Sequence, residues 1–358
     1  MDGTDGRPRY DAEGLRAWLT ALLIDAGLPA SDASVGAEVI VDADLSGVET
    51  HGLSNLTTHP HYLPGLESAV VAPAPVITEL RGSSVTAAWD AGRGFGPVVA
   101  HRAMTAAIEK AQAHGLGMIT VRNGCHFGTA GYFARLAAER GMIGMAMANT
   151  VAAGVPPGGA APAVGTNPIA VGAPIRGRAP FVFDMAVTAA AGTKVIVARR
   201  EGRQVPPGWI VDAEGRPTTD PDAYAGLLLL GAGPEGGGHK GFGLGLVVDL
   251  LAGLLSGTGA GIHQTFGPQW RIGYWLAAIS IEAFLEPAAF DQEMLRLVDA
   301  VHAVPPAAGA SGVLLPGERG AAVRADREAQ GIPLDTAVAN ACRDAGLRRG
   351  LPFPAALH

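Results

Sequence analysis

Apolar residues recur at helical spacing in the first part of the chain. Between residues 11 and 28, leucine and tryptophan return every three or four positions, and Gly27 with Pro29 ends the pattern. A second helix is expected directly afterwards, with Ser31 as its N-cap and with valine and isoleucine on one face. The pattern therefore predicts two amphipathic helices at this end of the chain.

The middle of the chain carries shorter apolar runs bounded by glycine and proline, which are typical of strands. Helical patterns alternate with these runs and dominate the C-terminal part, which predicts an α/β (α+β) chain with helical segments at both ends. The clearest boundary lies near residues 72–75. Strands are expected in short pieces at 70–88 and at 116–122, 142–148, 169–171 and 181–183, and helices at 97–115, 129–140, 240–256 and through most of 287–351.

The composition fits a chain that buries a large core. Of the 358 residues, 48% are hydrophobic and 16% are charged, and the net charge is −7 without a long run of Lys or Arg. These values argue against disorder, against nucleic-acid binding and against binding to an anionic membrane. The weakly charged stretches at 142–175 and 241–261 are interrupted by Pro, Gly or Asp, so they are interpreted as buried core and not as membrane spans.

Two features bear on the cellular compartment. Cys125 and Cys342 lie far apart and form no CxxC pair, so neither a disulfide framework nor a thiolate metal site is expected. The chain begins without a basic segment followed by an apolar one, and a cytoplasmic location is therefore expected.

Thr50-His51-Gly52 is the first candidate site. The imidazole of His51 titrates near neutral pH, so it can exchange a proton with a carbinol or carbonyl oxygen. A neighbouring hydroxyl, here that of Thr50, can orient such a ring, and Gly52 permits a tight backbone beside it. A histidine that is only hydrogen-bonded in a loop is the alternative that stays open at this point.

Other motifs place polar groups at turns and at the ends of elements. The loop 123–128 stands between an expected strand and an expected helix, whose N-terminal amides favour an anion such as a pyrophosphate. Thr166 and Asn167 lie in a rigid turn, Asp184 closes an apolar strand, and Lys240 and Arg319 could each pair with a phosphate. An ordinary turn, a helix cap or a solvated charge is the open alternative in each case.

Two simpler interpretations fail. The glycines at 92, 94 and 96 do not form GxGxxG, because the third falls one place early, so a Rossmann fingerprint is not supported. His59-Pro60-His61 spaces its imidazoles poorly on a helix and has no carboxylate or Cys at ligand spacing, so no metal site is expected.

The order of these motifs resembles that of one protein family. Thr-His-Gly is followed by Asn-x-x-His-Phe-Gly, Pro-Pro-Gly-Gly, Gly-Thr-Asn-Pro, an Asp closing an apolar strand, His-Lys-Gly and Pro-Gly-Glu-Arg. The set covers residues 15–349 and resembles the malate/L-lactate dehydrogenase family that lacks the Rossmann fold. That family also includes ureidoglycolate, sulfolactate and diketogulonate enzymes and a piperideine-carboxylate reductase.

The resemblance implies a fold. We expect a non-Rossmann, mixed, largely antiparallel sheet that binds the dinucleotide, plus a helical domain formed from both chain ends. Residues 1–74, completed by 287–358, are expected to form the helical domain, and residues 75–286 the dinucleotide-binding domain. A homodimer is also implied.

The resemblance also implies a function for individual residues. His51 matches the catalytic histidine, with Thr50 where the family usually has serine and with Asp184 in the same proton relay. Thr166 and Asn167 match the turn beside the nicotinamide and the substrate. The cofactor, NAD or NADP, is expected to contact His126, Phe127, Gly128, Thr129, Ala130, Phe183, Lys240, Pro316, Gly317, Glu318 and Arg319.

Two substrate-binding positions depart from the family pattern. Asn55 stands where the family usually has an Arg that binds the substrate carboxylate, and His59 stands where a Tyr is expected. Asparagine cannot reproduce the bidentate, charge-assisted contact of arginine. The leading hypothesis is hydride transfer between a nicotinamide and a small 2-oxo or 2-hydroxy acid, with His51 as general acid/base. A cyclic-imine reductase and a nucleotide-binding member without turnover are the alternatives.

Overall fold

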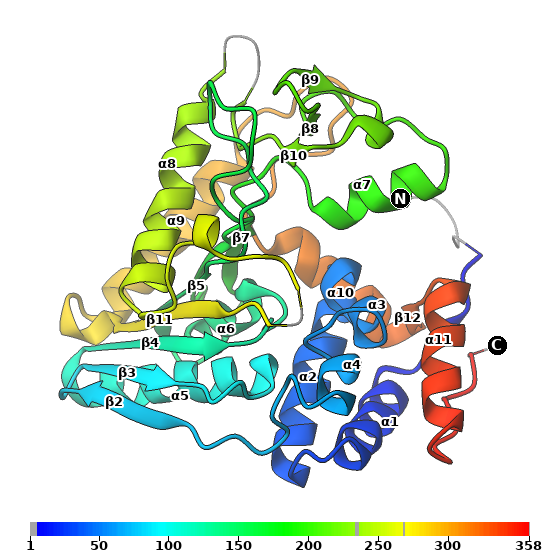
Figure 1. Cartoon of the computed structure of the whole chain (residues 1–358). Coiled ribbons are helices and arrows are strands. Elements are labelled where there is room, and N and C mark those ends of the chain that lie inside the picture. The colour runs from blue at the N-terminus through cyan, green and yellow to red at the C-terminus, as the bar shows by residue number, and fades with distance from the viewer. Residues whose placement is uncertain (1–5, 233–235, 268, 358) are drawn as a thin grey trace.

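The structure is a computed structural model that describes residues 6–232, 236–267 and 269–357. Its centre is a seven-stranded sheet in the order β2-β3-β4-β11-β5-β6-β7 (Figure 1). All neighbouring strands in this sheet run antiparallel except β3 and β4. The expected mixed, largely antiparallel sheet is therefore confirmed. Its strands are β2 (Thr78–Gly82), β3 (Thr86–Asp90), β4 (Leu116–Gly124), β5 (Met142–Ala148), β6 (Ile169–Ala173), β7 (Phe181–Met185) and β11 (Ile272–Ser280).

Helices cover both faces of this sheet. On one face, α5 (Gly96–His114) and α6 (Ala130–Ala138) pack against the central strands. On the other face lie α8 (Gly238–Val248) and a π-helical continuation, η3 (Asp249–Leu254). The side chains of β11 alternate between these two faces. Leu276 packs in the core beneath α5 and α6, and Trp275 packs in the core beneath α8 and η3.

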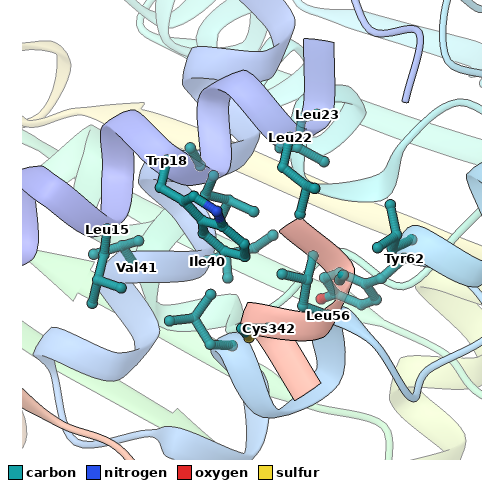
Figure 2. Packing of buried hydrophobic residues seen from close by; sticks show 14 of the residues in the cluster. Leu15, Trp18, Leu22, Leu23, Ile40, Val41, Leu56, Tyr62 and Cys342 are labelled. Carbon is teal, nitrogen blue, oxygen red and sulfur yellow. The ribbon is translucent and has the colours of Figure 1, made fainter. Parts of the chain in front are cut away.

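The helical domain joins the two ends of the chain, as expected. Helices α1 (Ala12–Asp25) and α2 (Ala30–Leu45) share one core with α11 (Thr336–Leu347), and Figure 2 shows Trp18, Ile40 and Cys342 packed together there. Strand β1 (Arg9–Tyr10) pairs antiparallel with β12 (Ile332–Pro333) and ties the same two segments. Short helices η1 (Glu49–His51), α3 (Leu53–Leu56) and α4 (Leu63–Glu67) follow α2.

Ser31 is not the N-cap of the second helix, contrary to expectation. Pro29 occupies that position with an extended ψ of 146°, and its carbonyl accepts the first helical hydrogen bond from Ala33 at 2.9 Å. Ser31 therefore lies inside the first turn.

The remaining elements lie around the central sheet and the helical domain. A small sheet of β8 (Ile210–Val211), β9 (Pro217–Thr218) and β10 (Gly226–Leu227) packs with α7 (Gly192–Arg200). Helix α9 (Pro287–His302) places Val298 in a separate small core with Ile175, whereas α10 (Glu318–Gln330) contacts α2. The division of the chain at residues 74 and 287 stays a prediction. Single turns complete the fold: η2 (Pro221–Ala223), η4 (Gly261–His263) and η5 (Ile281–Ala283).

Candidate active site

A buried carboxyl group shapes the backbone around His51. The Asp44 side chain accepts a hydrogen bond from the Leu53 N–H at 2.8 Å, and a Cβ on Gly52 would lie 2.1 Å from the same carboxyl. Gly52 is therefore needed because any side chain there would collide with Asp44. Burial raises the pKa of Asp44 to about 7, and the carboxylate of Glu49 acts in the same direction.

The His51 ring is held from two sides. The Thr50 hydroxyl lies 3.0 Å from Nδ1, and the ring stacks on that of His126 with 5.4 Å between centroids. His51 and the loop that begins at residue 126 therefore meet in space. Burial lowers the pKa of His51 to about 4, so the free protein holds this imidazole neutral at pH 7.

Further aromatic groups surround His51 and His126. The Tyr62 hydroxyl lies 2.8 Å from Nδ1 of His126, and the ring of His59 lies 4.6 Å from the His126 ring. Trp270 contacts His59 edge-on, with 5.8 Å between ring centroids. Within the described ranges, no group of three or more His, Cys, Asp or Glu residues is placed to hold a metal ion.

The two positions that depart from the family pattern lie close to His51 along the chain. Asn55 belongs to α3, and its backbone carbonyl accepts the His59 N–H at 3.0 Å. Both side chains are half-buried. An amide and a second imidazole thus follow His51 along the chain, and the His59 imidazole is close enough to His51 to interact with it electrostatically.

A pocket of about 480 Å³ lies between α2, α6, β7 and α10. It brings together Thr129, Gly317 and Arg319, three of the predicted cofactor contacts, with Asp184. Its lining also includes Val48, three residues before His51. Segments that are distant in the sequence therefore form one pocket, and His51 is not among the residues that line it.

Asp184 contacts the start of α6 and not His51. Its carboxylate accepts the Gly131 N–H at 2.7 Å, while Thr50 is the polar neighbour of the His51 ring. Asp184 lies exposed in the wall of the pocket, and partial desolvation by the protein atoms around it raises the pKa of its carboxyl to about 6. The expected Asp184–His51 contact is absent between these two described residues, because an amide in the first turn of a helix is a favourable partner for a carboxylate.

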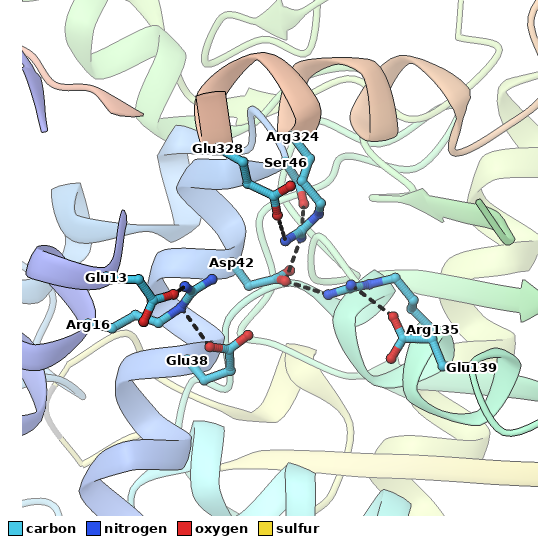
Figure 3. Close-up of polar contacts among 9 residues, drawn as sticks. All are labelled: Glu13, Arg16, Glu38, Asp42, Ser46, Arg135, Glu139, Arg324 and Glu328. Carbon is cyan, nitrogen blue, oxygen red and sulfur yellow. Dashed lines mark hydrogen bonds and ion pairs between the residues drawn. The ribbon is translucent and has the colours of Figure 1, made fainter. Parts of the chain in front are cut away.

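An ion network forms one wall of the pocket (Figure 3). Arg135 of α6 and Arg324 of α10 both bind the buried carboxylate of Asp42. Arg135 also pairs with Glu139, and Arg324 donates to the Ser46 hydroxyl at 2.7 Å. The network joins three elements and thereby fixes the width of the pocket between them.

Thr166 and Asn167 stand in a buried polar network. The Asn167 side chain donates to the Gly245 carbonyl at 2.8 Å and accepts the Thr150 N–H at 3.0 Å, with its own backbone at a φ of 38°. The Thr166 hydroxyl lies 3.3 Å from that of Thr150. The Asn167 amide therefore holds the turn in place, and Thr166 beside it is half-buried.

The other predicted cofactor contacts occupy varied surroundings. Phe127 stacks between Phe133 and Tyr274, which anchors the loop that Gly128 and Ala130 continue. Phe183 is half-buried on β7, and Pro316 accepts the Val182 N–H at 3.1 Å.

Glu318 pairs with His302 at 2.9 Å and accepts the Leu315 N–H. Lys240 is exposed in the first turn of α8 and is not among the residues that line the pocket.

Comparison with known proteins identifies the family. The malate/L-lactate dehydrogenase model matches residues 10–342. The chain belongs to the malate/L-lactate dehydrogenase family. A malate dehydrogenase of Pyrococcus abyssi is 35% identical over 96% of this chain and 95% of its own length. The resemblance inferred from the motifs is confirmed, and the chain is an NAD(P)-dependent oxidoreductase.

Solved structures of the family support the same conclusion. The malate dehydrogenase of Pyrococcus horikoshii superposes with a TM-score of 0.89 and 31% identity, covering 100% of this chain and 99% of that one. The Δ1-piperideine-2-carboxylate reductase of Pseudomonas syringae gives a TM-score of 0.82 and 30% identity, covering 94% and 99%. Family members with different named substrates therefore share this fold.

Sequence reasoning missed several residues that shape the family site. Asp42 and Asp44 hold the pocket wall and the His51 turn, and Tyr62 contacts His126. The available signal was two aspartates within the otherwise apolar stretch of α2, where an unpaired carboxylate is unfavourable. Asn149 and Asp249, which bond at 3.2 Å beneath the Thr166 turn, carried no comparable local signal.

Proposed function

We propose that this enzyme transfers a hydride between the nicotinamide of NAD or NADP and a small 2-oxo or 2-hydroxy acid, with His51 as general acid/base. The observation that carries this proposal is the position of the half-buried His51 imidazole, which contacts both Thr50 and His126. Relatives named malate dehydrogenase support a hydroxy acid as the substrate.

We propose that this pocket holds the dinucleotide. Gly317 lines the pocket at a φ of 98°, and a Cβ there would stand 2.8 Å from the backbone nitrogen of Val182, so glycine is needed for this segment to pack against β7. We propose that Arg319 pairs with a cofactor phosphate and that the first-turn amides of α10 add to this contact. When bound, the dinucleotide supplies or accepts the hydride.

We propose that His51 transfers the proton. In alcohol oxidation, neutral His51 accepts the hydroxyl proton, and in the reverse direction the protonated ring returns it. The contact between Thr50 and Nδ1 orients the ring so that Nε2 is available for this exchange. We propose that Asp184 acts through Gly131, as a positioning residue for the loop before α6.

The experiment is replacement of His51 by Ala. We expect kcat with hydroxy acids such as malate and lactate to fall by about 10²–10⁴, the usual range for loss of a general acid or base. Dinucleotide affinity, measured by fluorescence titration, should remain near that of the wild type. The matched control is His114→Ala, at the exposed end of α5. A near-normal rate in the His51 variant would remove this residue from the mechanism.

A cyclic-imine reductase is the second candidate. Asn55 in place of a carboxylate-binding Arg favours it, and a piperideine-carboxylate reductase is among the structures of the same fold. A panel of 2-oxo acids and cyclic imines separates the two activities by kcat/KM. Tight dinucleotide binding without turnover on either set would instead indicate a member that has lost catalysis.

We further propose a homodimer in the cytoplasm. One face of α8 and η3 exposes Leu246, Leu250 and Leu254, an apolar stripe of the kind that subunit interfaces cover. Cys125 and Cys342 are buried free thiols, which fits a reducing compartment. Among the described residues, no helix has the length and apolar character needed to cross a membrane.

A further inference from the structure

Backbone N–H groups fix the protons of the imidazoles beside His51. The His61 N–H donates to Nδ1 of His59 at 3.1 Å, the His126 N–H to Nδ1 of His61 at 3.0 Å, and the Gly128 N–H to Nδ1 of His126 at 3.3 Å. An N–H can only donate, so each Nδ1 presents its lone pair. A neutral ring in this arrangement carries its proton on Nε2 and offers it as a hydrogen-bond donor.

These donors are uncharged. Burial lowers the pKa of His59 to about 4 and the pKa of His126 well below its ordinary value, and the charges that reinforce both shifts are those of neighbouring histidines. In the described part of the chain, no Arg or Lys is hydrogen-bonded or ion-paired to His51, His59 or His126. The reacting end of the site therefore combines N–H donors with the absence of a fixed cation.

The cations near these rings are paired with carboxylates, since Arg7 and Arg327 both bind Glu49, two residues before His51. Arg135 and Arg324 bind Asp42 in the wall of the dinucleotide pocket, and Arg319 lines that same pocket. These three arginines thus line the pocket that lacks His51, whereas the half-buried His59 packs with its ring centroid 4.6 Å from that of His126, which stacks on His51.

We infer that His59 is a specificity-determining residue whose Nε2–H binds the uncharged end of a substrate with a single carboxylate. This inference rests on the proposed function and narrows its substrate class. A dianionic acid would have to bury a second carboxylate against neutral donors, which costs more than burying an uncharged group of the same shape. The enzyme should therefore favour monocarboxylic hydroxy acids over malate and over sulfonated acids.

A matched pair of substrates tests the charge directly. Malate and its 4-amide have nearly the same shape and differ by one negative charge. We expect kcat/KM of the wild-type enzyme to be at least about tenfold higher for the 4-amide, a difference that corresponds to about 1.4 kcal/mol. Equal values, or a preference for malate, would overturn the inference.

Variants at two positions test the donor and the missing cation. In His59→Leu we expect KM for the 4-amide to rise about tenfold with kcat little changed, because one hydrogen bond is lost. His59→Gln keeps an N–H donor and should recover most of this loss. Asn55→Arg adds a cation near His51 and should shift the preference toward malate by at least about tenfold. A rise in KM that is equal for both substrates in His59→Leu would show a merely structural role.

A binding measurement separates this inference from the proposed function. Oxamate is a monoanion and tartronate is a dianion, and each can be titrated against the enzyme–NADH complex by fluorescence. Tighter binding of oxamate in the wild type, lost in His59→Leu, supports the inference even if no hydroxy acid is turned over. Absence of turnover alone contradicts only the proposed function. Tighter binding of tartronate would contradict the inference, whatever the turnover.

Discussion

The chemistry of His51 is set by its neighbours and not by the residue type alone. Burial disfavours the charged imidazole, Thr50 holds Nδ1, and His126 covers one face of the ring. A free histidine titrates near pH 6.5, so it would be a mixture of two forms at neutral pH. In this site the neutral form dominates, and that form is the one needed to accept a proton from an alcohol.

The direction of the pKa shift predicts opposite pH dependences for the two directions of the reaction. For oxidation, kcat/KM should stay level down to about pH 5 and fall as His51 becomes protonated near its pKa of about 4. For reduction, kcat/KM should rise as the pH falls toward that value, because the protonated ring is the donor. Steady-state rates in both directions measure this. A fall in kcat/KM for oxidation centred at about pH 6.5, the ordinary pKa of histidine, would contradict a lowered pKa of this ring.

Asp44 predicts a pH-dependent stability. Its pKa is about 7 in the folded protein and near 3.8 when unfolded, so the folded state favours the protonated form. The stabilising effect of this protonated carboxyl is complete below about pH 4 and is lost as the pH rises through about 7. Asp44→Asn stays neutral and keeps an oxygen that can accept the Leu53 N–H. As the pH rises from 5 to 8, we expect the free energy of unfolding of this variant to increase relative to that of the wild type by on the order of 2–4 kcal/mol.

Urea unfolding at several pH values measures the difference. The matched control is Asp42→Asn, in the same helix, which weakens the ion pairs with Arg135 and Arg324 and should destabilise the protein at pH 8. A wild-type advantage over Asp44→Asn that grows with pH would show that the Asp44 carboxylate is stabilised in the folded protein, against this prediction.

At the scale of elements, local patterns predicted most helices and strands but missed the middle of the sheet. Strand β5 and helix α6 stand where the sequence indicated, within a residue or two at their ends. Strand β11 was not predicted, because both of its faces are buried and the apolar run 272–280 therefore shows no alternation. Its partners β4 and β5 precede it by more than a hundred residues, and no local signal encodes such a pairing.

The central place of β11 predicts a large cost for a cavity there. Leu276 is fully buried between α5, α6 and the sheet, so Leu276→Ala removes packed methyl groups and leaves a void. We expect a loss of about 2–5 kcal/mol in the free energy of unfolding, measured by urea denaturation. Leu80→Ala is the control, because Leu80 lies exposed on the edge strand β2 and its replacement should change stability by less than about 0.5 kcal/mol. Equal effects of the two changes would contradict a central position for β11.

At the scale of the whole molecule, the site exists only because distant segments meet. The pocket combines residues 42–48, 129–139, 179–184 and 317–328, and its lining includes Val48, three residues before His51. The resemblance to the family predicted several of these residues, but sequence spacing could not show that Asp184 turns toward Gly131 or that Lys240 lies outside this pocket. Both outcomes depend on the packing of α6 and α8 against the sheet and not on the motifs themselves.

The exposed stripe on α8 and η3 predicts how two copies associate. Leu250 and Leu254 are 56% and 57% exposed and lie four residues apart, so they share one face of the helix. Burying such a stripe in a subunit interface removes apolar surface from water, whereas two glutamates there would meet a like-charged copy of themselves across a two-fold axis. We therefore expect the wild type to run as a dimer by light scattering and Leu250→Glu/Leu254→Glu to run as a monomer with an unchanged circular dichroism spectrum. Leu347→Glu, an equally exposed leucine at the end of α11, is the matched control and should remain dimeric. A dimer that survives the double change would place the interface on another face, and a monomeric wild type would contradict the association itself.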